Sequence, residues 1–206
     1  MSISSYSQLA DYRCRVAESY ARVRDSTLPP EIRWQRFRTE QNNLFKSHPQ
    51  TALTHKQVDG FTCLNYFPYN PAYRFTLPIE TIADQDVVTI DLLDDGPTRL
   101  KPFGRIKFEI SSQEIYLTLF WIMGYGGGIF LPFKDLTSGI ETYAGGRYLI
   151  DTIKGADLGW EGDRLVIDFN FAYNPSCAYN ARWHCPLSPV ENHLPVAIPV
   201  GEMRFE

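Results

Sequence analysis

The sequence predicts a mainly β fold, an antiparallel β-barrel or sandwich, with an α-helical hairpin at its N-terminus. Apolar residues recur at helical spacing before residue 50, and side chains alternate between apolar and polar after about residue 60. Gly, Pro, Asn and Asp separate the alternating runs. With 206 residues, 44% of them hydrophobic and 21% charged, the chain is long enough to bury a core as one domain with an appendage.

Residues 1–50 are predicted to form a helical hairpin that packs on the main domain. Over residues 6–25, one helical face carries Leu9, Tyr12, Val16, Tyr20 and Val23. Leu28-Pro29-Pro30 interrupts the chain, and a second helix follows, because proline is tolerated in a first turn. The inner stripe of this second helix consists of Trp34, Phe37, Gln41, Leu44 and Phe45. Ser47-His48-Pro49 ends it, and the short connection between the helices indicates a hairpin.

Residues 60–206 are predicted to form the β-rich domain. Arg105–Ile110 alternates strictly between polar and apolar residues, which is typical of a half-buried strand. Residues 111–114 form a turn, and 115–122 provide a more buried partner strand. Further candidate strands are 72–78, 87–92, 129–133, 147–153, 165–171 and 196–200. Many short strands separated by turn residues indicate an antiparallel barrel or sandwich.

Charge and patterning argue against several classes of protein. The formal net charge of -4 provides no basic surface for nucleic acid. Residues 115–133 carry no charge, but the glycines and the proline in their second half favour two strands and a loop over a membrane helix. The N-terminus lacks the basic and apolar regions of a signal peptide, so we expect a cytoplasmic protein with reduced thiols. The glycine-rich loop 124–128 lacks the residues of a dinucleotide- or phosphate-binding loop.

Polar residues that could form a functional site are concentrated after residue 134. Strand periodicity places Asp168 and Asn170 on the same side of a predicted strand, where a buried carboxylate needs a partner. Arg147 is the nearest candidate, because its guanidinium can hold a carboxylate or an anionic ligand through two bonds. In the functional interpretation, Arg147 anchors a small anionic molecule and Asp168 transfers protons. Tyr143, Asn170 and Asn174 orient that molecule.

Four more residues are predicted to contact the ligand. Thr142 and Tyr148 flank the Arg147 motif, and Asp135 and Glu141 surround a predicted turn just before it. Two carboxylates can divide the roles of acid and base. Asp, Ser and Thr also bond their own backbone in turns, which is the structural alternative.

The two cysteines of the C-terminal region leave three interpretations open. Cys177 and Cys185 are eight positions apart, and His184 lies beside the second. They could form a disulfide or redox pair, bind a soft metal, or serve as small buried hydrophobes. The spacing matches no common zinc pattern, and we assign no metal ligands and no cofactor.

Several motifs occur in a characteristic order: TYAGGRYL (142–149), DFNFAYNPSCAY (168–179), CPLSPVENHLPV (185–196) and the late Gly201-Glu202. Upstream, NYFPYNPAYRF (65–75) and FLPFKDLTSG (130–139) fit the same pattern. Over residues 60–206 the chain resembles the bacterial domain of unknown function 1684 family. The resemblance implies a domain assignment but no activity. Two hypotheses therefore remain: a site that binds or turns over a small anionic molecule, and a non-catalytic ligand-binding or scaffold protein whose polar motifs are structural.

Overall fold

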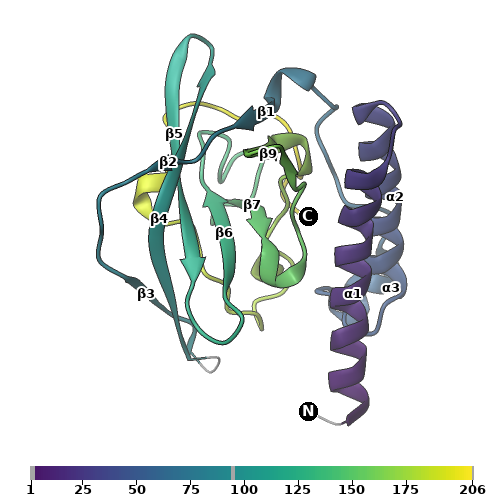
Figure 1. Cartoon of the computed structure of the whole chain (residues 1–206). Coiled ribbons are helices and arrows are strands. Elements are labelled where there is room, and N and C mark those ends of the chain that lie inside the picture. Colours follow the sequence, from purple (N-terminus) through teal and green to yellow (C-terminus); the bar gives the residue numbers. More distant parts are fainter. Residues whose placement is uncertain (1–2, 94–95, 206) are drawn as a thin grey trace.

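Two antiparallel sheets lie beside an N-terminal group of helices in the computed structural model, which describes residues 3–93 and 96–205 (Figure 1). The helices are α1 (Ile3–Asp25), α2 (Pro30–Ser47) and the short α3 (His55–Gly60). The strands are β1 (Arg74–Leu77), β2 (Glu80–Thr81), β3 (Val88–Asp91), β4 (Pro97–Ile110), β5 (Gln113–Ile122), β6 (Gly128–Phe133), β7 (Arg147–Asp151), β8 (Trp160–Glu161) and β9 (Arg164–Asp168). One sheet has the order β1-β9-β8; the other has the order β2-β4-β5-β6-β7, with β3 also paired to β4.

The two long helices form because their apolar residues share one face and proline separates them. Pro30 opens α2, where its missing N–H has no helical partner to lose. Tyr20, Trp34 and Phe37 are buried in a cluster that also contains Phe171 from the β-rich part. The Trp34 indole donates a hydrogen bond to the Asn170 carbonyl, with Nε1 and O 2.8 Å apart. The helices are therefore held against the end of strand β9.

The long β4–β5 hairpin provides the main surface of the core. Burial alternates along β4, as the sequence pattern predicts. Ser111 and Ser112 connect the strands with positive φ angles of 52° and 59°, the conformation of a two-residue hairpin turn. Apolar side chains of β4 and β5 pack with residues of β6, β7 and β9 in one cluster. The uncharged run 115–133 thus forms β5, a glycine-rich turn and β6.

The expectation of antiparallel β structure preceded by two helices is confirmed, but the finer prediction of a barrel or sandwich is not. Among the described strands, neither sheet closes on itself. No helix in the described part of the chain is long and apolar enough to cross a membrane.

Three predicted strands differ from the structure. The strand predicted over 165–171 ends at Asp168 and continues as the 3-10 helix Phe169–Phe171. Likewise, the strand predicted over 147–153 ends at Asp151 and is followed by a 3-10 helix. Residues 196–200 form no strand, although Val196, Ile198 and Val200 are buried in the core cluster. Their alternation reports burial correctly, but no described strand pairs with them: Ile198 and Val200 bond the side chains of Arg147 and Asp135, and Val196 accepts from the Leu136 amide.

Gly146, directly before Arg147, occupies a conformation that only glycine tolerates there. Its φ is +88°, and a Cβ at this position would overlap the carbonyl oxygen of Phe133. Gly126 has a similar φ of +84° but open space around it, so it is a matched control. We expect Gly126→Ala to cost about 1–2 kcal/mol of unfolding free energy from the backbone conformation alone. Gly146→Ala should cost clearly more, measured by urea denaturation; equal losses in the two variants would contradict this account.

Candidate functional site

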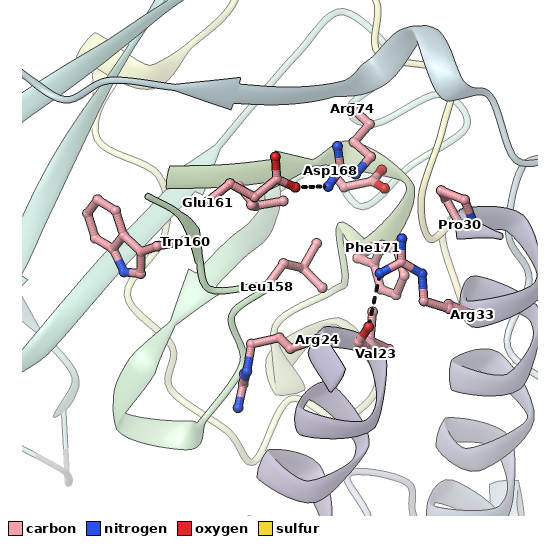
Figure 2. Close-up of a pocket in the computed structure, with 11 residues that line it drawn as sticks. Val23, Arg24, Pro30, Arg33, Arg74, Leu158, Trp160, Glu161, Asp168 and Phe171 are labelled. Carbon is pink, nitrogen blue, oxygen red and sulfur yellow. Dashed lines mark hydrogen bonds and ion pairs between the residues drawn. The ribbon is translucent and has the colours of Figure 1, made fainter. Parts of the chain in front are cut away.

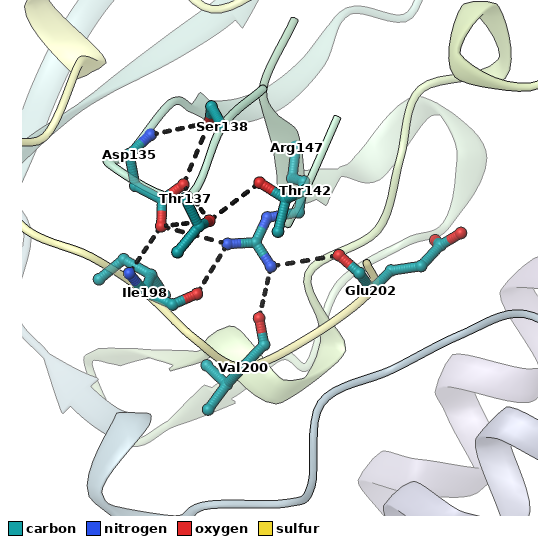
Figure 3. Close-up of polar contacts among 8 residues, drawn as sticks. All are labelled: Asp135, Thr137, Ser138, Thr142, Arg147, Ile198, Val200 and Glu202. Atoms are coloured by element: carbon teal, nitrogen blue, oxygen red, sulfur yellow. Dashed lines mark hydrogen bonds and ion pairs between the residues drawn. The ribbon is translucent and has the colours of Figure 1, made fainter. Parts of the chain in front are cut away.

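A fully buried ion pair connects the start of strand β7 with the C-terminal segment (Figure 3). The Arg147 guanidinium lies 3.4 Å from Oδ2 of Asp135, and both side chains have no exposed surface. The guanidinium also donates to the carbonyl oxygens of Ile198, Val200 and Glu202. Asp135 in turn accepts from the Ile198 amide, with 2.6 Å between N and Oδ2. Arg147 and Asp135 thus satisfy four backbone groups of residues 198–202, which belong to no named strand. Backbone groups of Phe67 and Ala172 bond Gly201 and Glu202.

The threonines and serine around Asp135 complete this network. Both Asp135 oxygens accept from the Thr137 hydroxyl, and Oδ1 accepts from Ser138. Thr142, with no exposed surface, shares a hydrogen bond with Thr137 at 2.9 Å. Burial lowers the pKa of Arg147 to about 10, opposed by the charges of Asp135 and Glu202. Arg147 therefore remains charged near neutral pH.

The expected pairing of Arg147 with Asp168 is wrong, because the two residues bind different partners. Oδ1 of Asp168 accepts from the backbone and side-chain N–H groups of Asn170, at 3.0 Å and 2.7 Å. Asn170 has no exposed surface and also bonds the backbone of Asn70 in both directions. These contacts follow from the 3-10 helix after β9, which turns Asn170 back toward Asp168. The predicted closeness of Asp168 and Asn170 is correct, although the strand periodicity that predicted it ends at Asp168.

The second carboxylate oxygen of Asp168, Oδ2, forms weaker hydrogen bonds than Oδ1. Tyr69 donates to Oδ2 at 3.5 Å, the outer limit of a hydrogen bond. Desolvation by burial raises the pKa of Asp168, and the hydrogen bonds from Asn170 lower it. A carboxyl group with a raised pKa beside a cavity is a candidate functional group.

Asp168 lines a cavity of about 130 Å³ between the helices and the β1-β9-β8 sheet (Figure 2). Arg33 of α2 and Arg74 of β1 lie on either side of the carboxylate in this view. Arg74 donates to Glu161 at 2.6 Å, and Arg33 donates to the Val23 carbonyl at 3.1 Å. Nε of Arg33 is buried and has no hydrogen-bond partner. Arg24 also lines the cavity, but its guanidinium bonds Asp157.

A third polar cluster surrounds Glu202 beneath the helices. The Glu202 side chain accepts from the Tyr179 hydroxyl and from the Asn174 amide, the latter at 3.0 Å. The Asn174 side chain donates to the Met203 carbonyl at 2.8 Å. Burial raises the pKa of Glu202 to about 7, although these hydrogen bonds oppose the shift. Asn174 therefore lies with Glu202 rather than with Asp168.

The remaining predicted site residues are dispersed. Tyr148 is buried, and its hydroxyl donates to the Pro186 carbonyl at 2.6 Å. Tyr143 is half-buried beside Cys177, and Glu141 is exposed. In the described part of the chain, no three His, Cys, Asp or Glu side chains are grouped as metal ligands.

Sequence reasoning missed Arg33, Arg74 and Glu202. The two arginines come from a helix and a strand far from Asp168 along the chain. Arg74 lies in the motif NYFPYNPAYRF (65–75), but nothing in that motif indicates its place opposite Asp168. Glu202 was visible only as part of the terminal Gly-Glu motif.

Removing Asp135 should destabilise the fold strongly. Asp135→Ala leaves the Arg147 charge buried without its carboxylate, a change that typically costs about 3–5 kcal/mol. The exposed Asp163 offers a control, and Asp163→Ala should stay within roughly 0.5 kcal/mol of the wild type. Chemical denaturation measures both. An Asp135→Ala protein as stable as the control would show that the pair does not hold the C-terminal segment.

Glu202 should make stability depend on pH. Because its folded pKa of about 7 exceeds the ordinary value of 4.5, the folded state holds a proton that the unfolded state has lost between these values. Raising the pH through this window therefore destabilises the wild type, by at most about 1.4 kcal/mol per pH unit. Glu202→Gln, of nearly the same shape, should lack this contribution. Urea denaturation at several pH values compares them, and parallel stability curves would contradict the assignment.

Comparison with known proteins identifies the family but no activity. No curated protein matches the chain. The structure is similar to the solution NMR structure of the uncharacterized protein from gene locus rrnAC0354 of Haloarcula marismortui, with a TM-score of 0.58 and 30% sequence identity. The match covers 84% of this chain and 93% of that one. The family model of a protein of unknown function, DUF1684, matches residues 59–203. The motifs quoted from the sequence and the fold that they specify therefore place this chain in the DUF1684 family.

Proposed function

We propose that the cavity beside Asp168 binds a small anionic molecule, with Arg33 and Arg74 as its anchors. The buried and unpartnered Nε of Arg33 carries this proposal. A buried donor without an acceptor costs about 1–3 kcal/mol, and an anion in the cavity would supply the acceptor. In this proposal Arg33 and Arg74 take the anchoring role that the sequence-based prediction gave to Arg147.

The charges around the cavity support an anionic ligand. Three arginines line it against two carboxylates, Glu161 and Asp168. Arg74 already bonds Glu161, so its guanidinium is held in place on the cavity wall. Because guanidinium groups bind phosphate and carboxylate in a bidentate manner, Arg33 and Arg74 are suited to either group.

The N-terminus of α2 adds to this preference. Pro30, the first residue of the helix, lines the cavity, and no side chain caps this end. The N-terminal turn of a helix attracts anions through its free N–H groups and its dipole. The helical hairpin thus contributes both a guanidinium and a helix end.

Asp168 is the carboxyl group that would face the ligand. Burial raises its pKa, which reduces the cost of protonating it beside an anion. Oδ1 is held by Asn170, so Oδ2 is the oxygen available to the ligand. The volume of about 130 Å³ is below the ~300–1,000 Å³ of drug-sized ligand pockets, so it suits a small molecule or one anionic group.

The alternative is a non-catalytic protein whose polar motifs are structural. The Arg147 network favours this interpretation for its own motif, because its guanidinium has no exposed surface and bonds Asp135 and three backbone carbonyl groups. The Nε atoms of Arg147 and Arg33 both lack a hydrogen-bond partner, but only Arg33 lines a cavity that a ligand could enter.

Inorganic phosphate tests the proposal. At ten times the dissociation constant, phosphate should stabilise the wild type by about 1.4 kcal/mol. This corresponds to a rise in melting temperature of roughly 3–6 °C. The double variant Arg33→Met/Arg74→Met should lose the rise. Arg36→Met is the matched control, because Arg36 is exposed on the same helix, and it should keep the rise.

Melting temperature without phosphate separates binding from folding. The double variant must still unfold cooperatively for its missing response to count. If a folded double variant shows the same rise in melting temperature with phosphate as the wild type, the proposal is wrong. The structural interpretation of the polar motifs would then be favoured.

A further inference from the structure

Cys177 and Cys185 face each other in the loop region after strand β9. Cys177 lies in the 3-10 helix Ser176–Ala178, and its amide donates to Sγ of Cys185 at 3.4 Å. Each thiol shifts the pKa of the other, as expected for neighbouring side chains. The two cysteines are therefore neighbours in space, and both thiols are free.

Tyr143 completes a three-residue cluster. Its hydroxyl donates to Sγ of Cys177 at 3.6 Å, from the loop that precedes β7. Burial and the neighbouring thiol raise the pKa of Tyr143 to about 12, so the phenol keeps its proton and remains a donor. The Tyr143 hydroxyl thus donates to the Cys177 sulfur, and the Cys185 thiol is a neighbour of the same residue.

This arrangement distinguishes the two cysteines chemically. Hydrogen bonds from Cys185 and Tyr143, with the nearby charge of His184, lower the pKa of Cys177 to about 6. The same hydrogen bond raises the pKa of Cys185. A thiolate is the nucleophilic form of cysteine, so Cys177 is the attacking sulfur and Cys185 the second thiol.

Both cysteines are partly exposed. Cys177 and Cys185 are half-buried, unlike a cysteine that serves only as a core residue. Cys14 on α1 and Cys63 after α3 are exposed and lie outside this cluster.

We propose that Cys177 and Cys185 form a redox-active dithiol that reacts with hydroperoxides and closes to a reversible internal disulfide. Tyr143 is a positioning residue that holds the attacking sulfur. This proposal does not depend on the anion cavity, which contains none of these residues.

The reaction balances with hydrogen peroxide as the oxidant. The Cys177 thiolate attacks one peroxide oxygen, an S–O bond forms, the O–O bond breaks, and the departing hydroxide takes up a proton as water. Cys177 is then a sulfenic acid. The Cys185 sulfur attacks it, the S–S bond forms, the S–O bond breaks, and the second oxygen leaves as water with the Cys185 proton. A small dithiol reverses the closure by thiol–disulfide exchange and is itself oxidised to a disulfide.

Intact-protein mass measurement on the full chain tests this. In a Cys14→Ser/Cys63→Ser background, stoichiometric hydrogen peroxide should remove two hydrogens from the protein, and dithiothreitol should restore them. Adding Cys185→Ser should leave a sulfenic acid on Cys177 that dimedone traps. Adding Cys177→Ser should abolish both products. Disulfide-linked dimers in place of the internal disulfide, or dimedone adducts on Cys185 alone, would overturn the proposal.

The pH dependence of thiol labelling tests the role of Cys177 in the wild-type protein, so that this test does not depend on whether a cysteine variant folds. Between pH 7.5 and pH 6, iodoacetamide labelling of an unstructured cysteine peptide, whose thiol has the ordinary pKa of about 8.5, should slow about 30-fold, because its thiolate fraction falls. Labelling of Cys177 should slow only about twofold over the same range. Tyr143→Phe should move the Cys177 profile toward that of the peptide while labelling of Cys14 stays unchanged. A Cys177 profile that coincides with the peptide profile in the wild type would rule out the attacking role.

Discussion

The burial of Arg147 against Asp135 is the constraint on which the C-terminal part of this fold depends. Residues 198–202 enter the core outside the named strands, yet their buried backbone groups need partners. Arg147 supplies donors to three carbonyl groups, and Asp135 accepts from the Ile198 amide. These two side chains therefore supply several of the hydrogen bonds that a neighbouring strand would otherwise provide, and backbone groups of Phe67 and Ala172 bond Gly201 and Glu202. Because an unpaired buried charge is costly, neither residue can perform this role without the other.

Local patterns in the sequence predict where helices and strands form. They do not predict how buried segments outside the sheets satisfy their backbone hydrogen bonds. The two helices, the β4–β5 hairpin and most strands follow from apolar spacing and turn residues, which depend on near neighbours in the chain. The failure at 196–200 has a clear physical cause. Val196, Ile198 and Val200 alternate as in a strand because they face the core, but alternation reports only burial and not the source of hydrogen bonds.

In the candidate site, too, the sequence predicts contacts between near neighbours in the chain but not contacts between distant residues. Sequence reasoning correctly grouped Asp168 with Asn170, since two positions separate them and local geometry brings them together. It wrongly paired Asp168 with Arg147, because both lie in polar motifs and nothing in one sequence gives their distance. Two other arginines line the cavity with Asp168. Arg74 reaches it through the pairing of β1 with β9, in which Arg74 is opposite Asp168, and Arg33 reaches it through the packing of α2 on the sheet. Long-range electrostatic partners require the tertiary structure.

The division of the chain makes the two proposed activities independent. The family model begins at residue 59, whereas Arg33 and the N-terminal end of α2 lie before it. The anion cavity therefore needs the helical hairpin as well as the family region. Cys177, Cys185 and Tyr143 all lie within the matched residues, as does the Arg147 network. Since α1 and α2 provide four of the eleven residues that line the cavity and none of the three residues of the thiol cluster, disturbing the docking of α2 should affect the cavity before it affects the thiols.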